Sequence, residues 1–230
     1  MKDKITEHWN KISPNYRKMY RDHLDEEILL MQNLFSEKLP AGKKLNVLDI
    51  GTGPGIQAFV FAEMGHNVTV LDISEEMLAR AKEGAKDRNL SIRFVEGDGE
   101  NLPFEDSMFD IIVNMHLLWT LTDHDKFFSE CLRVLVPGGR ILAIDGQWFQ
   151  PGYVPNRNYN PEERNHDELI EYLPLYDSNS PEMVTAIMEN NGFFEVSFKF
   201  LPEYAEYMKR CDPEGYDYLS VPYLATGIKH

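Results

Sequence analysis

Three aspartates and one glycine-rich loop are the residues of this chain whose types and spacing suit ligand chemistry. Asp49 stands near the end of an apolar run and is followed by the glycine-rich loop 51–55, Gly-Thr-Gly-Pro-Gly. Asp72 and Asp98 follow the next two apolar runs in the same manner. If these runs are parallel strands, their carboxyl ends meet at one edge of a sheet, and open α/β sheets bind ligands at that edge. The sequence therefore predicts a ligand site there.

The three carboxylates suit different parts of one ligand. The loop has the pattern G-x-G-x-G rather than the G-x-G-x-x-G of dinucleotide enzymes, and its glycines let the backbone approach a ligand closely. Asp49 would repel a pyrophosphate but attract an ammonium group. Asp72 is placed to accept hydrogen bonds from a vicinal diol such as ribose, and Asp98 to accept one from the exocyclic amine of adenine. Any single aspartate could equally cap a turn or a helix, so the prediction depends on the three together.

Short apolar runs that alternate with helical patterns are the elements that must position these residues. Each run is apolar on both faces, which is typical of a parallel sheet covered by helices on two sides. The predicted strands are 45–50, 68–73, 92–95, 109–115 and 140–145, with two closing strands at 194–201 and 219–228. We therefore expect an α/β fold built on a doubly wound, mostly parallel sheet.

Helical patterns flank this alternation. Apolar residues recur at three- and four-residue spacing up to about residue 39, with a break expected at Pro14. A further helix is predicted over 180–190, whereas 147–161 shows no period and is predicted to be a long loop. We expect a single domain with three parts: a helical cap (1–40), a cofactor-binding core (45–145), and a lid with closing strands (146–230).

Composition and charge disfavour several classes of protein. The 230 residues are 43% hydrophobic and 27% charged, as in an ordinary globular domain. A net charge of −15 disfavours nucleic acid and membrane partners and favours cationic or neutral small ligands. The two cysteines are far apart and no metal-ligand spacing occurs, so we expect no metal site. The chain has neither an apolar leader nor a run near the ~20 residues that cross a membrane, which predicts a cytoplasmic protein.

Five segments between residues 45 and 145 carry a resemblance to a known family. In order along the chain they are VLDIGTGPG (47–55), VLDIS with Met77 (70–77), GDGENLPF (97–104), FDIIV (109–113) and RVLVPGGRI (133–141). Together they resemble the class I S-adenosylmethionine-dependent methyltransferase family, in its small-molecule branch. The remaining parts of the chain match only in general layout. The resemblance implies a Rossmann-like sheet with an antiparallel last strand, and S-adenosylmethionine as the cofactor.

The resemblance also implies roles for individual residues. Asp72 would hold the ribose hydroxyls, while Ile73 and Met77 would pack on the adenine. Asn114, near the end of the fourth strand, would lie beneath the sulfonium, and Tyr16 of the helical cap would close over the cofactor. The full set of cofactor-binding residues that it implies is Tyr16, Asp49, Gly51, Gly53, Asp72, Ile73, Met77, Asp98, Gly99 and Asn114.

The acceptor side of the predicted site is less well defined. His116 is the candidate general base, because the carboxyl end of the fourth strand faces the transferred methyl group; a histidine held by backbone in this turn is an equally good interpretation. Together with His116, Asp145, Trp148 and Tyr153 are the residues expected to line the substrate. At Met115 the chain departs from the resemblance, since close relatives often have an arginine there.

The predicted activity is methyl transfer from S-adenosylmethionine to a nitrogen, oxygen or sulfur atom of a small molecule, cationic or neutral. One alternative is an enzyme that cleaves another sulfonium bond, by aminocarboxypropyl transfer or cyclisation, and releases methylthioadenosine. A second is a nicotinamide-dependent oxidoreductase, against which Asp49 and the missing third glycine argue. A third is a cofactor-binding subunit without activity of its own. The sequence does not indicate an oligomeric state.

Overall fold

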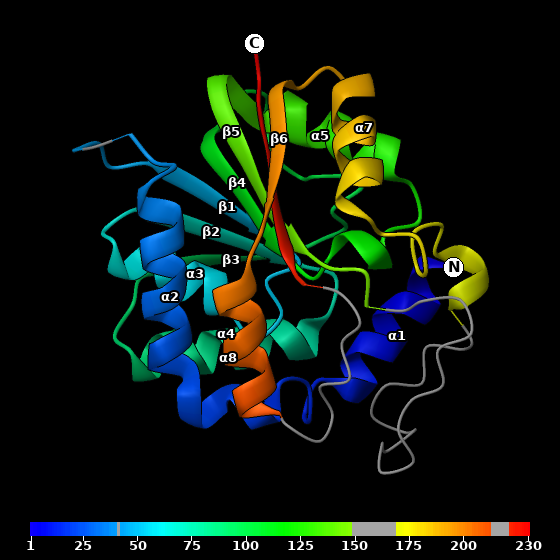
Figure 1. Ribbon diagram of the computed structural model, residues 1–230. Coiled ribbons are helices and arrows are strands. Elements are labelled where there is room, and N and C mark those ends of the chain that lie inside the picture. Colours follow the sequence, from blue (N-terminus) through cyan, green and yellow to red (C-terminus); the bar gives the residue numbers. More distant parts are fainter. Residues whose placement is uncertain (41, 149–168, 213–220) are drawn as a thin grey trace.

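The computed structural model describes residues 1–40, 42–148, 169–212 and 221–230, and these contain one seven-stranded sheet in the order β3-β2-β1-β4-β5-β7-β6. Figure 1 shows this arrangement. The first five strands pair in parallel, and β7 runs antiparallel to both of its neighbours. The strands are β1 (Asn46–Ile50), β2 (Asn67–Asp72), β3 (Ile92–Glu96), β4 (Phe109–Met115), β5 (Leu135–Asp145), β6 (Phe194–Phe200) and β7 (Tyr223–Ile228). The predicted Rossmann-like sheet with an antiparallel last strand is confirmed.

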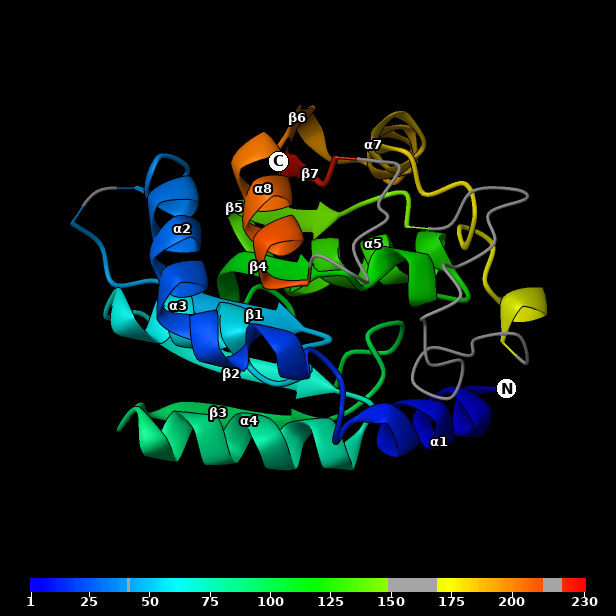
Figure 2. The same cartoon turned by 60° about the horizontal axis from the view of Figure 1, so that its bottom comes forward.

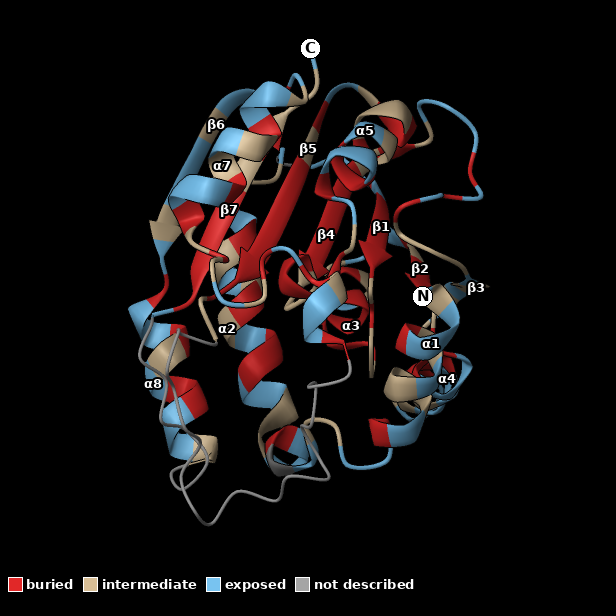
Figure 3. Ribbon diagram, turned by 90° about the vertical axis from the view of Figure 1, so that its right-hand side faces the viewer, coloured by how far each residue is buried: buried red, intermediate tan, exposed pale blue. Residues whose placement is uncertain are grey.

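Helices cover both faces of this sheet. Side chains of α2, α3, α4 and α8 join one apolar cluster, and side chains of α5 and α7 join another on the opposite face. In Figure 3 the central strands between these layers are almost entirely buried. The helices are α1 (Lys2–Ile12), α2 (Leu24–Ser36), α3 (Ile56–Glu63), α4 (Glu75–Asp87), α5 (His124–Val134), α7 (Pro181–Asn190) and α8 (Pro202–Cys211), with short 3₁₀ turns η1 (Lys18–His23), η2 (Leu118–Thr120) and η3 (Ile170–Tyr172).

Side-chain caps fix where several helices begin. The Ser74 hydroxyl accepts a hydrogen bond from the backbone N–H of Met77 at 3.1 Å and so starts α4 directly after β2. Asp123 caps α5 in the same way. The predicted break near Pro14 is confirmed, because α1 ends at Ile12. These caps hold the helices at the carboxyl ends of the strands, where the predicted ligand residues lie.

The carboxyl-terminal part differs from the sequence prediction in two respects. Residues 202–211 form α8, which the sequence analysis does not identify as a helix; its buried residues Tyr204, Tyr207 and Met208 lie at helical spacing. The last strand begins at Tyr223, four residues later than predicted. Most of the predicted long loop and of the lid segment lies outside the described residues.

We expect Ser180→Ala to lower the free energy of unfolding by about 1 kcal/mol, the usual contribution of a helix cap. Ser180 starts α7, and its hydroxyl accepts a hydrogen bond from the N–H of Met183 at 3.2 Å. Urea unfolding monitored by circular dichroism measures the change. Ser36→Ala, in the exposed last turn of α2, is the matched control and should leave the midpoint almost unchanged. Equal midpoints for both variants would refute the capping role.

Candidate cofactor and acceptor site

A hollow opens at the carboxyl ends of β1, β2 and β4. Figure 2 shows α1 lying across these strand ends. The predicted cofactor-binding residues line this hollow with the exception of Asn114; those that do are Tyr16, Asp49, Gly51, Gly53, Asp72, Ile73, Met77, Asp98 and Gly99. The structure thus brings together residues that span most of the first hundred positions of the chain.

The glycine loop turns the chain tightly between β1 and α3. Gly51, Gly53 and Gly55 all have left-handed backbones, with φ of 69°, 52° and 95°. A Cβ atom at position 51 would lie 2.7 Å from Leu117 Cδ1, so that side chain would have to shift. The loop therefore presents backbone rather than side chains to the hollow, which suits close approach of a ligand.

Asp49 is the most unusual carboxylate of the hollow. Its side chain is 1% exposed, and its Oδ2 accepts a hydrogen bond from the Thr52 hydroxyl at 2.6 Å. Its Oδ1 is buried and has no hydrogen-bond partner among the described residues. Burial raises the pKa of this carboxyl to about 7. A buried carboxylate oxygen that lacks a well-formed hydrogen bond is costly, and a cationic ligand group such as an ammonium would satisfy it.

Asp72 lies beside Asp49 at the end of β2. It is 7% exposed, and burial raises its pKa to about 6. Its Oδ2 accepts a hydrogen bond from Gly53 N at 2.8 Å, and its Oδ1 accepts one from Ser74 N at 2.9 Å. Each carboxylate oxygen has a further lone pair, so Asp72 can hold the glycine loop and still accept hydrogen bonds from two hydroxyl groups. This geometry fits the diol role that the sequence predicts.

Asp98 differs from the other two because a lysine already contacts it. Lys2 Nζ lies 3.1 Å from Asp98 Oδ1 and 2.7 Å from Glu100 Oε1. The backbone N–H of Glu100 also donates to Asp98 Oδ1, at 2.9 Å. Both contacts reach the same oxygen, which leaves Oδ2 for a ligand. Sequence reasoning missed Lys2, because nothing in its local pattern indicates that the first helix reaches the loop after β3.

The helical cap, residues 1–40, covers the hollow. Asn10 Oδ1 lies 2.7 Å from the Ser74 hydroxyl, and Arg80 of α4 donates to the carbonyl oxygens of Ser13 and Tyr16, the latter at 3.1 Å. These contacts hold α1, and the residues that follow it, against α4. The roof contributes Ile5, Trp9 and Tyr16 to the lining.

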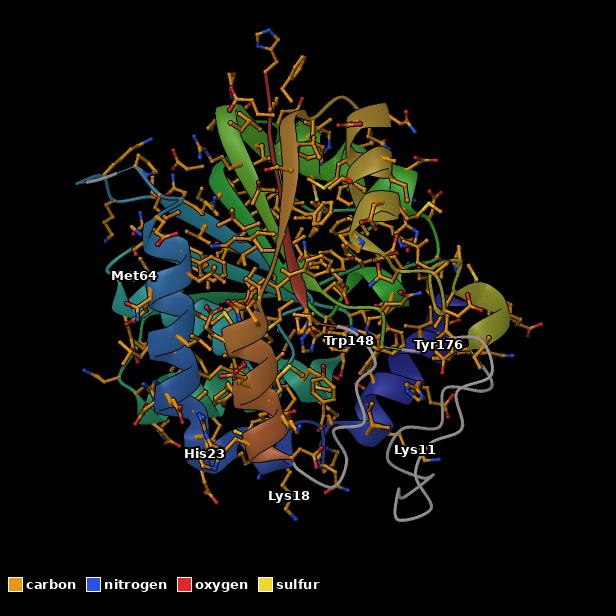
Figure 4. The ribbon with its side chains drawn as sticks, viewed as in Figure 1. Lys11, Lys18, His23, Met64, Trp148 and Tyr176 are labelled. Carbon is orange, nitrogen blue, oxygen red and sulfur yellow. The ribbon has the colours of Figure 1, made fainter. Side chains whose placement is uncertain are left out.

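The three tryptophans of the chain gather beside this roof. Trp9 and Trp119 pack edge to face with ring centroids 6.1 Å apart, and both belong to one apolar cluster with Trp148 and Tyr176. Figure 4 labels Trp148 and Tyr176 beside α1. Ile5 and Trp9 belong both to this cluster and to the lining of the hollow.

His116 stands at the other end of the hollow, just beyond β4. It has a left-handed backbone with φ of 57°, and its N–H donates to Ile144 O at 2.8 Å. The imidazole centroid lies 4.6 Å from the ring of Trp148 and 6.2 Å from the ring of Tyr204. The histidine therefore lines the hollow and lies next to two aromatic side chains.

Several predicted residues lie elsewhere. Asn114 is fully buried and does not line the hollow, because alternation along β4 turns Met115 toward the hollow instead. Asp145 is likewise fully buried beneath the site: it accepts hydrogen bonds from Trp148 Nε1 at 2.6 Å and Leu118 N at 2.8 Å. Asp145 holds the indole of Trp148, and neither Asp145 nor Trp148, both predicted to line the substrate, lines the hollow. Tyr153 lies outside the described residues.

Comparison with known proteins agrees with this geometry. Residues 48–143 match a family described as a methyltransferase domain. The ubiquinone/menaquinone biosynthesis C-methyltransferase UbiE of Idiomarina loihiensis is 37% identical over 106 residues, which cover 44% of this chain and 42% of that protein. The demethylmenaquinone methyltransferase of Thermus thermophilus is 36% identical over 115 residues, covering 49% of this chain and 50% of that protein. The chain thus aligns with half or less of the length of these two relatives.

Solved structures share the fold over most of the chain. The PH0226 protein of Pyrococcus horikoshii has a TM-score of 0.66 at 19% identity, covering 93% of this chain and 94% of that one. The phosphoethanolamine N-methyltransferase 2 of Haemonchus contortus, in complex with S-adenosyl-L-methionine, has a TM-score of 0.64 at 21% identity, covering 86% of this chain and 52% of that one.

The fold and the site define an α/β domain that binds a small molecule at the carboxyl edge of its sheet. Residues 48–143 match the methyltransferase-domain family, and their motifs are those of class I S-adenosylmethionine-dependent methyltransferases. S-adenosylmethionine is the cofactor of this family. The Asp49 oxygen without a hydrogen-bond partner fits its amino group, and Asp72 fits its ribose. The glycine loop lets the backbone approach the cofactor closely. Among the described residues, no helix is long and apolar enough to cross a membrane.

We expect Asp72→Ala to weaken binding of S-adenosylhomocysteine by about 1.5–3 kcal/mol, the usual effect of losing hydrogen bonds to a charged group. Isothermal titration calorimetry measures the dissociation constant. Asp87→Ala, at an exposed position of α4, is the control and should bind like the unmodified chain. An unchanged dissociation constant in Asp72→Ala would remove this residue from the site.

Ligand binding should depend on pH through Asp49. With a pKa of about 7, this carboxyl is mostly protonated near pH 6 and mostly ionised near pH 8, and only the ionised form attracts an ammonium group. We expect S-adenosylhomocysteine to bind about tenfold more tightly near pH 8 than near pH 6, with proton release on binding. Asp49→Asn should bind weakly at both values. A pH-independent constant in the unmodified chain would contradict the assignment.

The same carboxyl groups make the ligand-free chain less stable as pH rises. The folded pKa values of Asp49 and Asp72, about 7 and about 6, exceed the usual unfolded value near 3.9. The folded state therefore holds more protons than the unfolded state between about pH 4 and pH 7, and the free energy of unfolding falls across this window. Thermal unfolding at several pH values measures the trend, and Asp49→Asn should reduce it.

Proposed function

We propose that this chain transfers the methyl group of S-adenosylmethionine to a small-molecule acceptor. The observation that carries the proposal is the buried Asp49 Oδ1, which has no partner among the described residues and lies in the same hollow as the glycine loop and Asp72. The set supports a ligand with an ammonium group at one end and a diol near the middle. The family match over residues 48–143 supports the same ligand.

When bound, the cofactor supplies a methyl group on a positively charged sulfur. The residues of the chain would hold it at fixed points: Asp49 and the glycine loop at the amino acid end, Asp72 at the ribose, and Ile73 with Met77 against the adenine. The cap excludes water through Trp9 and its neighbours. Such positioning of two reactants supplies ~7–11 kcal/mol of the barrier reduction.

His116 is the residue that we propose to take a proton from the acceptor. It lines the hollow beyond β4, at the end away from Asp72 and Asp98, and its ring packs against Trp148. A positioned base of this kind contributes about 10²–10⁴-fold. Asp145 supports it indirectly by fixing the indole of Trp148.

The acceptor is proposed to be a cationic or neutral small molecule, and the net charge of −15 argues against nucleic acid. The names of the relatives include carbon methylation of quinone precursors and nitrogen methylation of phosphoethanolamine, so they support a small acceptor without choosing its atom. We also propose a cytoplasmic location; both cysteines, Cys131 and Cys211, are free thiols, which suits a reducing compartment.

Product analysis tests the proposed reaction. Incubation with S-adenosylmethionine and a mixture of candidate acceptors should yield S-adenosylhomocysteine, identified by mass spectrometry. Methylthioadenosine as the product would show that another sulfonium bond is cleaved instead. Reduction of a nicotinamide cofactor without either product would indicate an oxidoreductase.

We expect His116→Asn to lower turnover by about 10²-fold or more while the dissociation constant for S-adenosylhomocysteine stays the same. Asparagine is the suitable replacement because it tolerates the left-handed backbone at this position. Initial rates and calorimetry measure the two quantities. His23→Asn, in the cap and outside the hollow, is the control and should retain full turnover. Full turnover in His116→Asn would end the general-base proposal.

A further inference from the structure

A second buried hydrogen-bond acceptor belongs to the wall of the hollow, in addition to Asp49 Oδ1. It is Oε1 of Gln57, in the first turn of α3. Gln57 is 3% exposed and lines the hollow, and this oxygen has no hydrogen-bond partner among the described residues. A buried amide oxygen that receives no hydrogen bond is costly, and an apolar side chain would avoid that cost. The amide at this position therefore indicates a contact with a ligand.

The start of α3 brings Gln57 close to Asp49. The glycine loop turns the chain between the end of β1 and the first residue of this helix, so both residues line the same hollow. The backbone N–H of Ala58, which directly follows Gln57, faces the Asp49 carboxylate and opposes the rise in its pKa that burial causes. Asp49 Oδ1 and Gln57 Oε1 are thus two neighbouring buried acceptors that come from different elements.

Met115 determines which end of the Gln57 amide is left for a ligand. Gln57 Nε2 lies 2.9 Å from Met115 Sδ, and a thioether sulfur can accept a hydrogen bond but cannot donate one. The reverse orientation of the amide would place its oxygen against this sulfur, an acceptor against an acceptor. The hydroxyl of Tyr204 lies 3.8 Å from the same sulfur and helps to hold it in place. The amide nitrogen is therefore engaged by Met115, and the oxygen remains for a donor.

The two acceptors restrict the chemistry of the group that they can hold together. Neither an ionised carboxylate nor an amide oxygen has a proton to give, so their common partner must carry at least two N–H or O–H donors. The negative charge of Asp49 favours a cation. Among the described residues, the lysine and the arginine that line the hollow, Lys2 and Arg17, already form ion pairs with other carboxylates. A primary ammonium group of a ligand, with its three N–H donors, meets these requirements.

We propose that Gln57 binds the ammonium group of S-adenosylmethionine together with Asp49, and that Met115 holds the amide in the orientation that this contact requires. One carboxylate attracts the ammonium, and a second acceptor from another element also fixes the direction of the carbon chain that leads to the sulfur. Gln57 thereby determines specificity for the amino acid end of the cofactor. This inference rests on the proposed function, because it adds a residue to the same site.

Three ligands that differ only at the amino acid end test the proposal. They are S-adenosylhomocysteine, its deaminated analogue, in which hydrogen replaces the ammonium group, and 5′-methylthioadenosine, which lacks both the ammonium and the carboxylate. Calorimetry on the full chain near pH 8, where Asp49 is mostly ionised, measures the dissociation constants, with competition against S-adenosylhomocysteine for the weaker ligands. We expect S-adenosylhomocysteine to bind at least about tenfold more tightly than its deaminated analogue. Equal binding of these two ligands overturns the proposal.

Gln57→Met and Gln57→Leu test the residue itself. Both remove the amide oxygen and keep an apolar side chain in the buried position, and methionine also keeps the length of glutamine. We expect each variant to bind S-adenosylhomocysteine about tenfold more weakly, because a hydrogen bond to a charged group is lost, and to bind the two ligands without an ammonium group as the unmodified chain does. Gln32→Met, in α2 and outside the hollow, is the matched control and should leave all three constants unchanged.

Two results with the Gln57 variants would overturn the proposal. One is unchanged affinity for S-adenosylhomocysteine in both variants. The other is an equal loss of affinity for all three ligands, which is the result expected if Gln57 only supports the packing of the loop.

Met115→Leu tests the contact that orients the amide. Leucine keeps the apolar bulk but removes the sulfur, so the amide is free to turn. We expect the affinity for S-adenosylhomocysteine to fall about threefold, the effect of losing one neutral hydrogen bond, while the affinity for the deaminated analogue stays the same. Unchanged affinity for S-adenosylhomocysteine would show that Met115 has no part in orienting the amide.

The unmodified chain separates this inference from the proposed function. If it fails to bind S-adenosylhomocysteine, the proposed function is wrong. If it binds S-adenosylhomocysteine and the Gln57 variants bind it equally well, only the inference about Gln57 is wrong.

Discussion

The desolvated carboxylate of Asp49 is the constraint on which the rest of the site depends. It is buried at the end of β1, one of its oxygens has no partner among the described residues, and its pKa is raised to about 7 as a result. The adjoining loop can approach a ligand at this point only because its glycines adopt left-handed backbones. The second carboxylate, Asp72, holds that loop in place through Gly53 N. The buried carboxylates, the glycine loop and the order of the strands that carry them therefore all contribute to one site.

The helical cap converts this sheet edge into an enclosed site. Lys2, Asn10 and Arg80 form the contacts between the cap and the cofactor side of the sheet. At the other end, Arg17 and Glu27 join the cap to α8 through Tyr204. The same short segment of chain thus contacts both the loop after β3 and α8.

The sequence predicts the core of the fold well because the signals there are local. The apolar runs and the glycine loop each occupy a few adjacent residues, and the aspartates that follow them lie where parallel strands must converge. The prediction that Asn114 lines the site is wrong, although its strand is predicted correctly. Side chains alternate between the two faces of a strand, and it is the neighbouring Met115 that lines the hollow. The pairing of Arg17 with Tyr204 spans 187 positions. No local pattern reveals a contact of that separation, so the contacts between the cap and α8 could not be predicted from the sequence.

The clustering of all three tryptophans beside the roof has a practical consequence for studying the molecule. Trp9, Trp119 and Trp148 share one apolar cluster that includes Leu169 and Leu173. Indole emission shifts to longer wavelength when water reaches the ring, and here all three indoles lie in or against this one cluster. The wavelength of intrinsic tryptophan emission should therefore report whether α1 remains packed in its place, without an attached dye.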